Sequence, residues 1–389
     1  MADNVGMTVH LESKLPHVGT TIFTVMSALA AECGAINLSQ GFPDYDGPQA
    51  LKEAVKRRID GGFNQYPPMA GVAPLREAVA AKVLARYGAK VCAETEVTIT
   101  PGATEAIYCA VTAVARPGDE VILFDPAYDC YEPAVTLAGA RPIRLPLLPP
   151  AYRIDWQRVK ESITPRTRMI VINSPHNPTG TVLTGEDLTT LTELAERHNL
   201  LVCSDEVYEH LIFDGCRHES VLRYPALAAR SFVVSSFGKT YHVTGWKTGY
   251  CVAPAALTAE LRRVHQFVTF VGITPIQLGL AEFMQAHPEH LDELPGFYQR
   301  KRDLFVQAIA NSRFRTTPSA GTYFQLADYS AISDLPDRAF CEWLTREVGV
   351  AAIPVSVFYE TPPEARIVRF CFCKNDDTLR AGAARLTAL

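Results

Sequence analysis

A lysine that follows an apolar stretch is the best candidate for covalent chemistry in this chain. It lies in Ser235-Ser236-Phe237-Gly238-Lys239-Thr240, directly after a run typical of a buried strand. Flanked by small residues, Lys239 is poorly placed for a surface charge, and desolvation would lower its pKa toward the neutral amine that imine formation needs. A solvated surface position is the usual interpretation of a single lysine, but this pattern favours a reactive amine.

Two nearby patterns predict a phosphate site beside this amine. Ser236 and Lys247 lie close to Lys239 in the sequence and carry groups that bind phosphate. The segment Pro101-Gly102-Ala103-Thr104-Glu105 lies between a predicted strand and a predicted helix. A helix N-terminus with small residues leaves backbone N–H groups free for an anion, and Thr104 adds a hydroxyl. Alone, this second pattern is equally typical of ordinary scaffold.

Two further motifs each end an apolar, strand-like run. Asn177 belongs to residues 173–180, whose Pro and Gly are explained by a turn. A turn does not explain its amide, which could donate a hydrogen bond to an aromatic ring oxygen. Asp205, in residues 204–208, is costly to bury without a positive partner, and a protonated pyridine nitrogen is one such partner. A helix cap is the alternative for Asp205, and Glu206 is expected to be structural or solvated.

Short apolar runs that alternate with helical stretches must position these residues. Strands are predicted at Val97–Thr100, Glu120–Phe124, Arg168–Asn173, Leu200–Ser204, Ser231–Ser235 and Gly249–Ala253, with a helix through Glu105–Ala115. Continuous apolar strands are typical of parallel sheets that are buried on both faces. The pattern therefore predicts an α/β layered domain with its site at the carboxyl ends of the strands.

After about Pro295 the pattern changes to α+β. The predicted elements are helices at Gly296–Ala310, near Arg338–Val348 and from Asp376, a segment at Gly321–Ala327, and a strand at Arg366–Phe372. The segment before Gly41 is helical around Ile22–Cys33, is too small to stand alone, and is expected to pack against the C-terminal part. We predict a large domain of residues 46–295 and a small domain of residues 1–45 plus 296–389.

Composition limits the classes of partner. The 389 residues are 48% hydrophobic and 20% charged, as in an ordinary globular protein. The net charge of −5 and the scattered Lys and Arg argue against nucleic acid. No apolar run approaches the roughly 20 residues that cross a bilayer, and Met1–His10 lacks a secretion-signal pattern. The 10 cysteines form no CxxC, so we expect no metal and reduced thiols in the cytoplasm, without a disulfide between Cys371 and Cys373.

Taken together, the motifs resemble those of the class I/II aminotransferases, which share the type I pyridoxal-phosphate fold. The family pattern Ser-x-x-Lys followed by Gly-x-(Arg/Lys)-x-Gly, with Asn-Pro-x-Gly and Asp-x-x-Tyr, is matched by Ser236, Lys239, Gly245, Lys247, Gly249, Asn177, Pro178, Gly180, Asp205 and Tyr208. The resemblance runs from Gly19 to Leu386. Residues 37–44, 125–133, 174–178 and 368–372 resemble the kynurenine aminotransferase/glutamine transaminase K branch, and residues 234–254 are similar to its bacterial methionine aminotransferases.

This resemblance implies a pyridoxal 5′-phosphate cofactor and roles for the matched residues. Lys239 would hold the cofactor as a Schiff base and move the substrate's α-proton. Asp205 would pair with the pyridinium nitrogen, and Tyr208 would bind the phenolic oxygen. The other implied cofactor contacts are Gly102, Ala103, Thr104, Tyr128, Asn177, Ser236 and Lys247. The implied substrate-carboxylate contacts are Arg369, Asn177 and Gly41. Tyr66 would reach the phosphate of the neighbouring subunit, which implies a homodimer.

The implied reaction is ping-pong transfer of an amino group from an amino acid to a 2-oxo acid. No arginine is evident as a second carboxylate clamp, and Ile22, Phe23, Tyr128 and Phe270 are candidates either for an apolar pocket lining or for plain core. Methionine, aromatic amino acids, histidine or glutamine are therefore expected as donors rather than aspartate or glutamate.

Several rival functions remain open at this point. A kynurenine or glutamine transaminase, or a lyase that cleaves the carbon–sulfur bond of cysteine conjugates, would use the same residues. A non-catalytic regulator on this fold is disfavoured, because the chain has no room for a DNA-binding domain before Gly19. A nicotinamide dehydrogenase is disfavoured because no Gly-x-Gly-x-x-Gly follows a strand.

Overall fold

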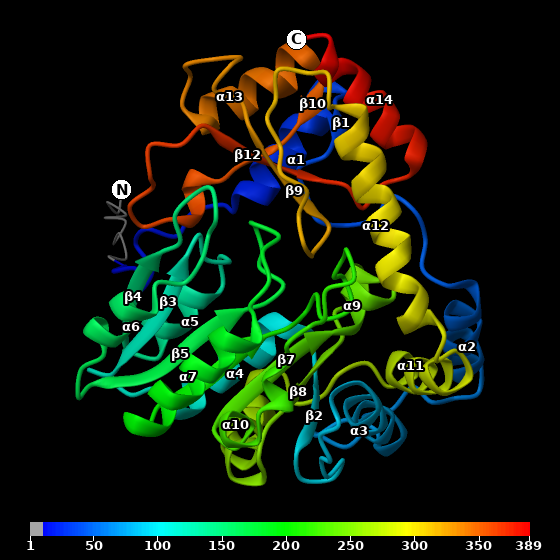
Figure 1. Ribbon diagram of the computed structural model, residues 1–389. Coiled ribbons are helices and arrows are strands. Elements are labelled where there is room, and N and C mark those ends of the chain that lie inside the picture. The colour runs from blue at the N-terminus through cyan, green and yellow to red at the C-terminus, as the bar shows by residue number, and fades with distance from the viewer. Residues whose placement is uncertain (1–10) are drawn as a thin grey trace, which may run out of the picture.

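A seven-stranded, mostly parallel sheet forms the centre of the larger part of the molecule (Figure 1). The computed structural model describes residues 11–389, so the prediction made for Met1–His10 lies outside it. The sheet order is β2-β8-β7-β6-β5-β3-β4. Its strands are β2 (Val97–Thr100), β3 (Glu120–Asp125), β4 (Arg141–Pro146), β5 (Thr167–Asn173), β6 (Leu201–Asp205), β7 (Ser231–Ser236) and β8 (Gly249–Val252). The predicted α/β class with a mostly parallel sheet is confirmed, although β8 runs antiparallel to both neighbours.

Helices cover both faces of this sheet because its side chains alternate between two cores. On β3, Ile122 and Phe124 join one core, whereas Val121 and Leu123 join the other. The first core takes in α2 (Gln49–Asp60), α3 (Ala73–Tyr87), α6 (Trp156–Ser162), α7 (Gly185–Arg197), α8 (Pro225–Ala228) and α11 (Thr274–Ala286). The second takes in α4 (Ala103–Val114), α5 (Tyr131–Leu137) and α10 (Ala255–Val268). The sheet is therefore buried on both sides.

The two ends of the chain build a smaller α+β part around a third core. Its helices are α1 (Ile22–Cys33), α13 (Asp337–Trp343), a π-helix at Leu344–Val348 and α14 (Asp376–Thr387). Its strands are β1 (Ile36–Asn37), β9 (Phe324–Asp328), β10 (Val350–Ala351), β11 (Ile353–Pro354) and β12 (Ile367–Cys371). β1 pairs in parallel with β10, with Ile36 opposite Val350. The blue start of the chain accordingly lies among orange and red segments in Figure 1.

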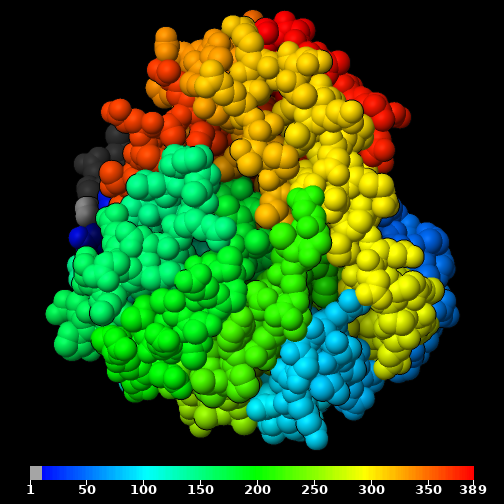
Figure 2. All heavy atoms as spheres, viewed as in Figure 1, coloured from blue at the N-terminus to red at the C-terminus, as the bar shows by residue number. Residues whose placement is uncertain are grey.

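A long helix, α12 (His290–Ala308), links the two parts. The yellow atoms of this helix run along one side of the surface view (Figure 2). Pro295, where the sequence pattern changes, lies inside α12, so the proposed domain boundary at residues 295 and 296 cuts a continuous helix. The division into residues 46–295 and 1–45 plus 296–389 stays a prediction. No helix among residues 11–389 is long and apolar enough to span a membrane.

Candidate active site

The strand register brings four sequence motifs to one edge of the sheet. Asn173, at the end of β5, is opposite Asp205 at the end of β6. Ser236, at the end of β7, is opposite Gly249 of β8, which in turn pairs with Thr100 at the end of β2. Because these strand ends lie side by side, the segments that follow them converge on one place.

A cavity of about 170 Å³ lies at this edge, between the larger and smaller parts. Among the residues that line it are Gly41, Gly102, Ala103, Thr104, Tyr128, Asn177, Asp205, Tyr208, Ser236, Lys239, Lys247 and Arg369. These are all but one of the site residues predicted from the sequence. The exception is Tyr66, whose side chain is 81% exposed and contacts the ring of Phe270 at 5.7 Å between centroids.

Lys239 is held at the wall of the cavity by a short helix, α9 (Phe237–Thr240), which begins directly after β7. Its Nζ lies 6.0 Å from the centre of the Tyr208 ring and 5.7 Å from that of Tyr323. Burial, the largest cause, lowers the pKa of the Lys239 amine, and the positive charges of Lys247 and Arg369 act in the same direction. This environment favours a neutral, nucleophilic amine.

Asp205 ends β6 with its carboxylate buried at the floor of the cavity. Its Oδ2 accepts a hydrogen bond of 2.6 Å from the Tyr131 hydroxyl, and Oδ1 accepts one of 3.2 Å from the backbone N–H of Val207. Burial raises the pKa of Asp205 to about 6, against the effect of these hydrogen bonds. Within residues 11–389 this carboxylate has no ion-pair partner, so a cationic group in the cavity would stabilise its charged form.

Tyr131, the donor to Asp205, is a site residue that sequence reasoning missed. It lies at the start of α5, three residues after Tyr128, and both rings face the cavity. Tyr131 belongs to the segment 125–133 that carried the family resemblance, and this was a usable signal. Its partner Asp205 is 74 residues away in sequence, and no pattern in the chain relates the two.

Arg369 is brought to the cavity by β12 of the smaller part. Its side chain is fully buried, and its guanidinium carbon lies 3.8 Å from the centre of the Phe324 ring. Nη1 donates to Asn177 Oδ1 at 2.7 Å, and Nη2 donates to the Ser39 carbonyl at 2.9 Å. Burial lowers the pKa of Arg369. Its Nε is buried without a hydrogen-bond partner, which is unusual for a guanidinium.

Small residues and the start of a helix form the other end of the cavity. Gly102 has φ +86°, a conformation that favours glycine, and α4 begins at the next residue. A Cβ atom at Gly102 would lie 3.4 Å from Nζ of Lys247. The free N–H groups of the first turn of α4, with Ser236 and Lys247, make a site with positive potential that suits a phosphate.

Gly249 allows β8 to pack directly against this helix start. A Cβ atom there would lie 2.7 Å from the Ser235 carbonyl oxygen and 3.0 Å from the backbone nitrogen of Ala103. We expect Gly249→Ala to lower the free energy of unfolding by about 1–3 kcal/mol through overpacking. The matched control is Gly245→Ala, because nothing lies within 4 Å of a Cβ atom at that position. Thermal or urea unfolding of both variants is the measurement, and equal destabilisation would contradict the packing argument.

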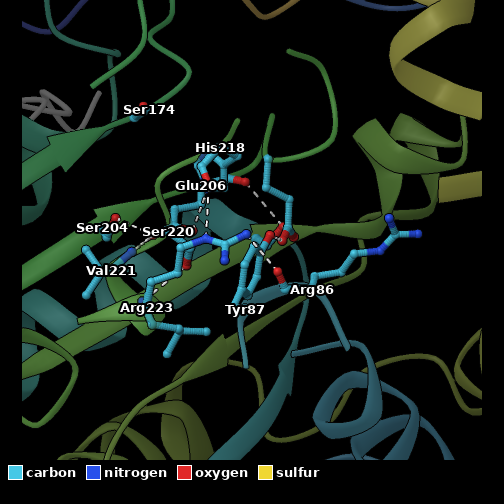
Figure 3. A network of polar contacts seen from close by, with 12 residues as sticks. Arg86, Tyr87, Ser174, Ser204, Glu206, His218, Ser220, Val221 and Arg223 are labelled. Carbon is cyan, nitrogen blue, oxygen red and sulfur yellow. Dashed lines mark hydrogen bonds and ion pairs between the residues drawn. The ribbon is translucent and has the colours of Figure 1, made fainter. Parts of the chain in front are cut away.

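Glu206 is not among the residues that line the cavity, and its side chain lies in a buried polar network (Figure 3). Its carboxylate accepts hydrogen bonds from the Ser204 hydroxyl at 2.9 Å and the Val221 N–H at 3.0 Å, and it lies 2.8 Å from Nε2 of His218. With its side chain fully enclosed, Glu206 contributes to the structure behind the site. This agrees with the structural role expected for it, and it is buried rather than solvated.

Aromatic side chains line the open side of the cavity. Phe23 and Tyr128 both do so, as two of the four apolar candidates from the sequence, and their ring centroids are 6.4 Å apart. Ile22 instead packs against the core of the smaller part, and Phe270 is 43% exposed beside Tyr66. The sequence had left lining and core open for all four candidates, and Ile22 takes the core alternative. Gln40 and Phe324 also line the cavity and were not anticipated.

Comparison with known proteins adds independent information. The family model for aminotransferase class I and II matches residues 34–386. The chain is 53% identical to the methionine aminotransferase of Escherichia coli, covering 97% of this chain and 98% of that protein. A solved structure of an Escherichia coli protein with methionine aminotransferase function superimposes with a TM-score of 0.96 at 52% identity, covering 98% of this chain and 100% of that one.

Two other relatives have different substrates in their names. The chain is 42% identical to the probable N-succinyldiaminopimelate aminotransferase of Mycobacterium tuberculosis, over 97% of this chain and 98% of that protein. It is 32% identical to kynurenine–oxoglutarate transaminase 1 of Rattus norvegicus, over 98% of each chain. The resemblance to the kynurenine aminotransferase branch and to bacterial methionine aminotransferases is confirmed by these relatives.

Proposed function

The chain belongs to the class I and II aminotransferases, and we propose that it moves the amino group of methionine, or of another apolar or aromatic amino acid, to a 2-oxo acid by a ping-pong mechanism. Enzymes of this family use pyridoxal 5′-phosphate in general. The observation that supports the proposal best is the convergence of Lys239, Asp205 and Arg369 on one cavity. The 53% identity to a methionine aminotransferase supports the choice of donor.

The cavity suits pyridoxal phosphate at each end. The first turn of α4, from Gly102 to Thr104, would hold the phosphate together with Ser236 and Lys247. Asp205, a buried carboxylate without an ion-pair partner in residues 11–389, would pair with a protonated ring nitrogen. When bound, the cofactor supplies an electron sink for the negative charge that develops at the substrate α-carbon.

Residues around the ring position would orient the cofactor. Tyr128 would stack on one ring face, and Asn177 and Tyr208 would donate hydrogen bonds to the phenolic oxygen. Tyr131 would hold Asp205 in place through its hydrogen bond to Oδ2. Asn173 would fix Asn177, because its Oδ1 accepts from the Asn177 N–H at 2.8 Å.

Lys239 is proposed to bind the cofactor covalently and then to act as the acid–base group. Burial lowers its pKa and so favours the neutral Nζ that would accept the α-proton of the substrate and donate it back at the next step. The rings of Tyr208 and Tyr323 lie close to Nζ and exclude water from it. A second half-reaction, with a 2-oxo acid, would run the same proton movements in reverse.

Arg369 is proposed to bind the substrate carboxylate. Arg369 lines the cavity together with Asn177 and Gly41, and its planar guanidinium has the fork geometry that binds a carboxylate. It is the one arginine among the residues that line this cavity in the described chain. An amino acid with a second carboxylate would therefore lack a partner, which favours apolar donors such as methionine.

We also propose that the active protein is a cytoplasmic homodimer. Tyr66 and Phe270 are exposed in the single chain, as are Phe63, Phe267, Val268 and Ile273. Several large exposed apolar side chains are typical of an interface rather than of free surface. Tyr66 would then reach the phosphate of the partner subunit's site.

Single amino acids, mixed with cofactor-loaded protein in the absence of an acceptor, test the proposed function. Absorbance of the cofactor is followed for methionine, phenylalanine, kynurenine, aspartate and N-succinyldiaminopimelate. Rapid conversion by methionine or aromatic amino acids, with little by aspartate, is the expected result. Pyruvate and ammonia from a cysteine conjugate, without amination of the cofactor, would indicate a lyase instead. A cofactor band that survives every amino acid would contradict the proposal and favour a non-catalytic regulator.

A further inference from the structure

A buried ion pair lies behind the site and takes no part in the chemistry proposed above. Lys82 on α3 lies 2.7 Å from Glu209, which follows β6 by four residues. The side chains are 7% and 3% exposed. Burying two charges costs several kcal/mol for each ion, so the surrounding structure must supply compensating contacts.

Glu209 receives those contacts from three different elements. Its Oε1 accepts hydrogen bonds from the Ser235 hydroxyl on β7 at 2.6 Å and from the Tyr250 hydroxyl on β8 at 2.7 Å. Its Oε2 accepts from Lys82 and from the Tyr87 hydroxyl, both on α3. Lys82 also donates to the Tyr250 hydroxyl at 2.5 Å. One carboxylate therefore joins α3, β7 and β8 to the turn after β6.

Glu209 and its two hydrogen-bond donors in the strands, Ser235 and Tyr250, are each next in sequence to a residue that lines the cavity or packs against the start of α4. Glu209 follows Tyr208 in the sequence, and Ser235 precedes Ser236. Tyr208 and Ser236 both line the cavity. Tyr250 follows Gly249, whose backbone packs against the first residue of α4. A shift of the Glu209 carboxylate would thus be transmitted to the proposed ring-oxygen and phosphate contacts together.

We propose that the Lys82–Glu209 pair is a positioning unit that sets the geometry and the electrostatic potential at Tyr208, Ser236 and Lys239. The inference rests on the proposed function, since it concerns the cofactor that those residues would hold. Neither Lys82 nor Glu209 lines the cavity, so both act through other residues.

The groups around Glu209 leave its negative charge balanced by the positive charge of Lys82. Burial opposes ionisation of Glu209, yet Lys82 and the hydrogen bonds hold its pKa well below the usual value. His210 has its Nε2 3.8 Å from Glu209, but burial lowers its pKa to about 3 and keeps it neutral. The separate Glu206–His218 contact is adjacent, with the rings of Tyr87 and His218 6.0 Å apart (Figure 3). Removing one partner would therefore leave one uncompensated charge.

Three variants test the inference: Glu209→Gln, Lys82→Met and the double variant. The readouts are the rate of cofactor release and the pH midpoint of the visible absorption band of cofactor-loaded protein. We expect each single variant to release the cofactor roughly tenfold faster. Glu209→Gln leaves the Lys82 charge, which disfavours a protonated nitrogen at Lys239 and lowers the midpoint. Lys82→Met leaves the negative charge of Glu209, which favours a protonated nitrogen at Lys239 and raises the midpoint. The double variant should return the midpoint toward the parent value.

The matched control is Glu120→Gln at the opposite end of the same sheet. Glu120 is also a buried carboxylate, bonded to Thr164, Arg141 and Arg166, and it begins β3. This variant is expected to lose stability without a change in either readout. If the Lys82 and Glu209 variants behave like Glu120→Gln, or shift the midpoint in the same direction, the pair is only structural and the inference is wrong.

A different result would contradict the proposed function rather than the positioning inference. If borohydride does not attach the cofactor to Lys239 in the parent protein, the cofactor assignment itself is wrong. If attachment occurs in the parent and the variants match it in release rate and midpoint, only the positioning inference fails. Should a single variant not fold, the double variant, which removes both charges, still reports the release rate.

Discussion

Lys239→Ala is expected to lower turnover by about 10³-fold or more, while the protein still binds pyridoxal phosphate. The amine would supply both the covalent attachment and the proton transfer at the α-carbon, so its loss removes two steps at once. The phosphate and ring contacts from α4, Ser236 and Asp205 do not depend on it, and they should retain the cofactor non-covalently. Steady-state rates with methionine measure the loss, and mass spectrometry after borohydride reduction measures the attachment.

An exposed lysine provides the control for that experiment. Lys56→Ala removes the same group from α2, where the side chain is 64% exposed, and should leave the turnover rate at the parent value. Small primary amines added to Lys239→Ala should restore part of the rate, because they replace the missing acid–base group. Near-normal turnover by Lys239→Ala would overturn the assignment of Lys239 as the acid–base residue.

Arg369→Lys is expected to reduce kcat/KM for methionine by about 10²–10³-fold. Lysine keeps the charge but loses the planar fork and the stacking on Phe324. The test compares methionine with the corresponding amine, which lacks the carboxylate. If Arg369 binds the carboxylate, the variant loses activity toward methionine and little toward the amine.

Unfolding measurements separate this effect from damage to the fold. Arg369 is fully buried and holds the Ser39 carbonyl and Asn177, so some loss of stability is expected as well. An equal loss of kcat/KM for methionine and for the amine would show that Arg369 supports the structure without recognising the carboxylate.

Several of the residues that sequence reasoning recovered are attached to strand ends. Lys239, Asp205 and Asn177 each follow an apolar run, and parallel strands carry such residues to one edge. Tyr131 and Phe324 were missed because their contacts with Asp205 and Arg369 exist only in three dimensions. No local pattern relates residues that lie on different elements far apart in the sequence.

The sequence did not predict three features of the fold, each for a physical reason. β4 (Arg141–Pro146) is an edge strand with two arginines and two prolines, so it lacks the apolar run that marks a central strand. The antiparallel direction of β8 depends on the connection before it, and composition does not encode direction. The sequence pattern placed a boundary at Pro295, yet α12 continues through this residue. The helix lacks one backbone hydrogen bond there, because proline has no N–H.

The pairing of β1 with β10 has a consequence for synthesis on the ribosome. Ile36 cannot pair until Val350, its partner in the strand pair, has been made 314 residues later (350 − 36). At about 5–20 residues per second, this delay lasts tens of seconds. During that time the apolar face of α1, with Met26 and Leu29, has none of its C-terminal partners to cover it. The larger part can fold as it emerges, whereas α1 is made before it and enclosed after it, so α1 is the segment that a chaperone would need to protect.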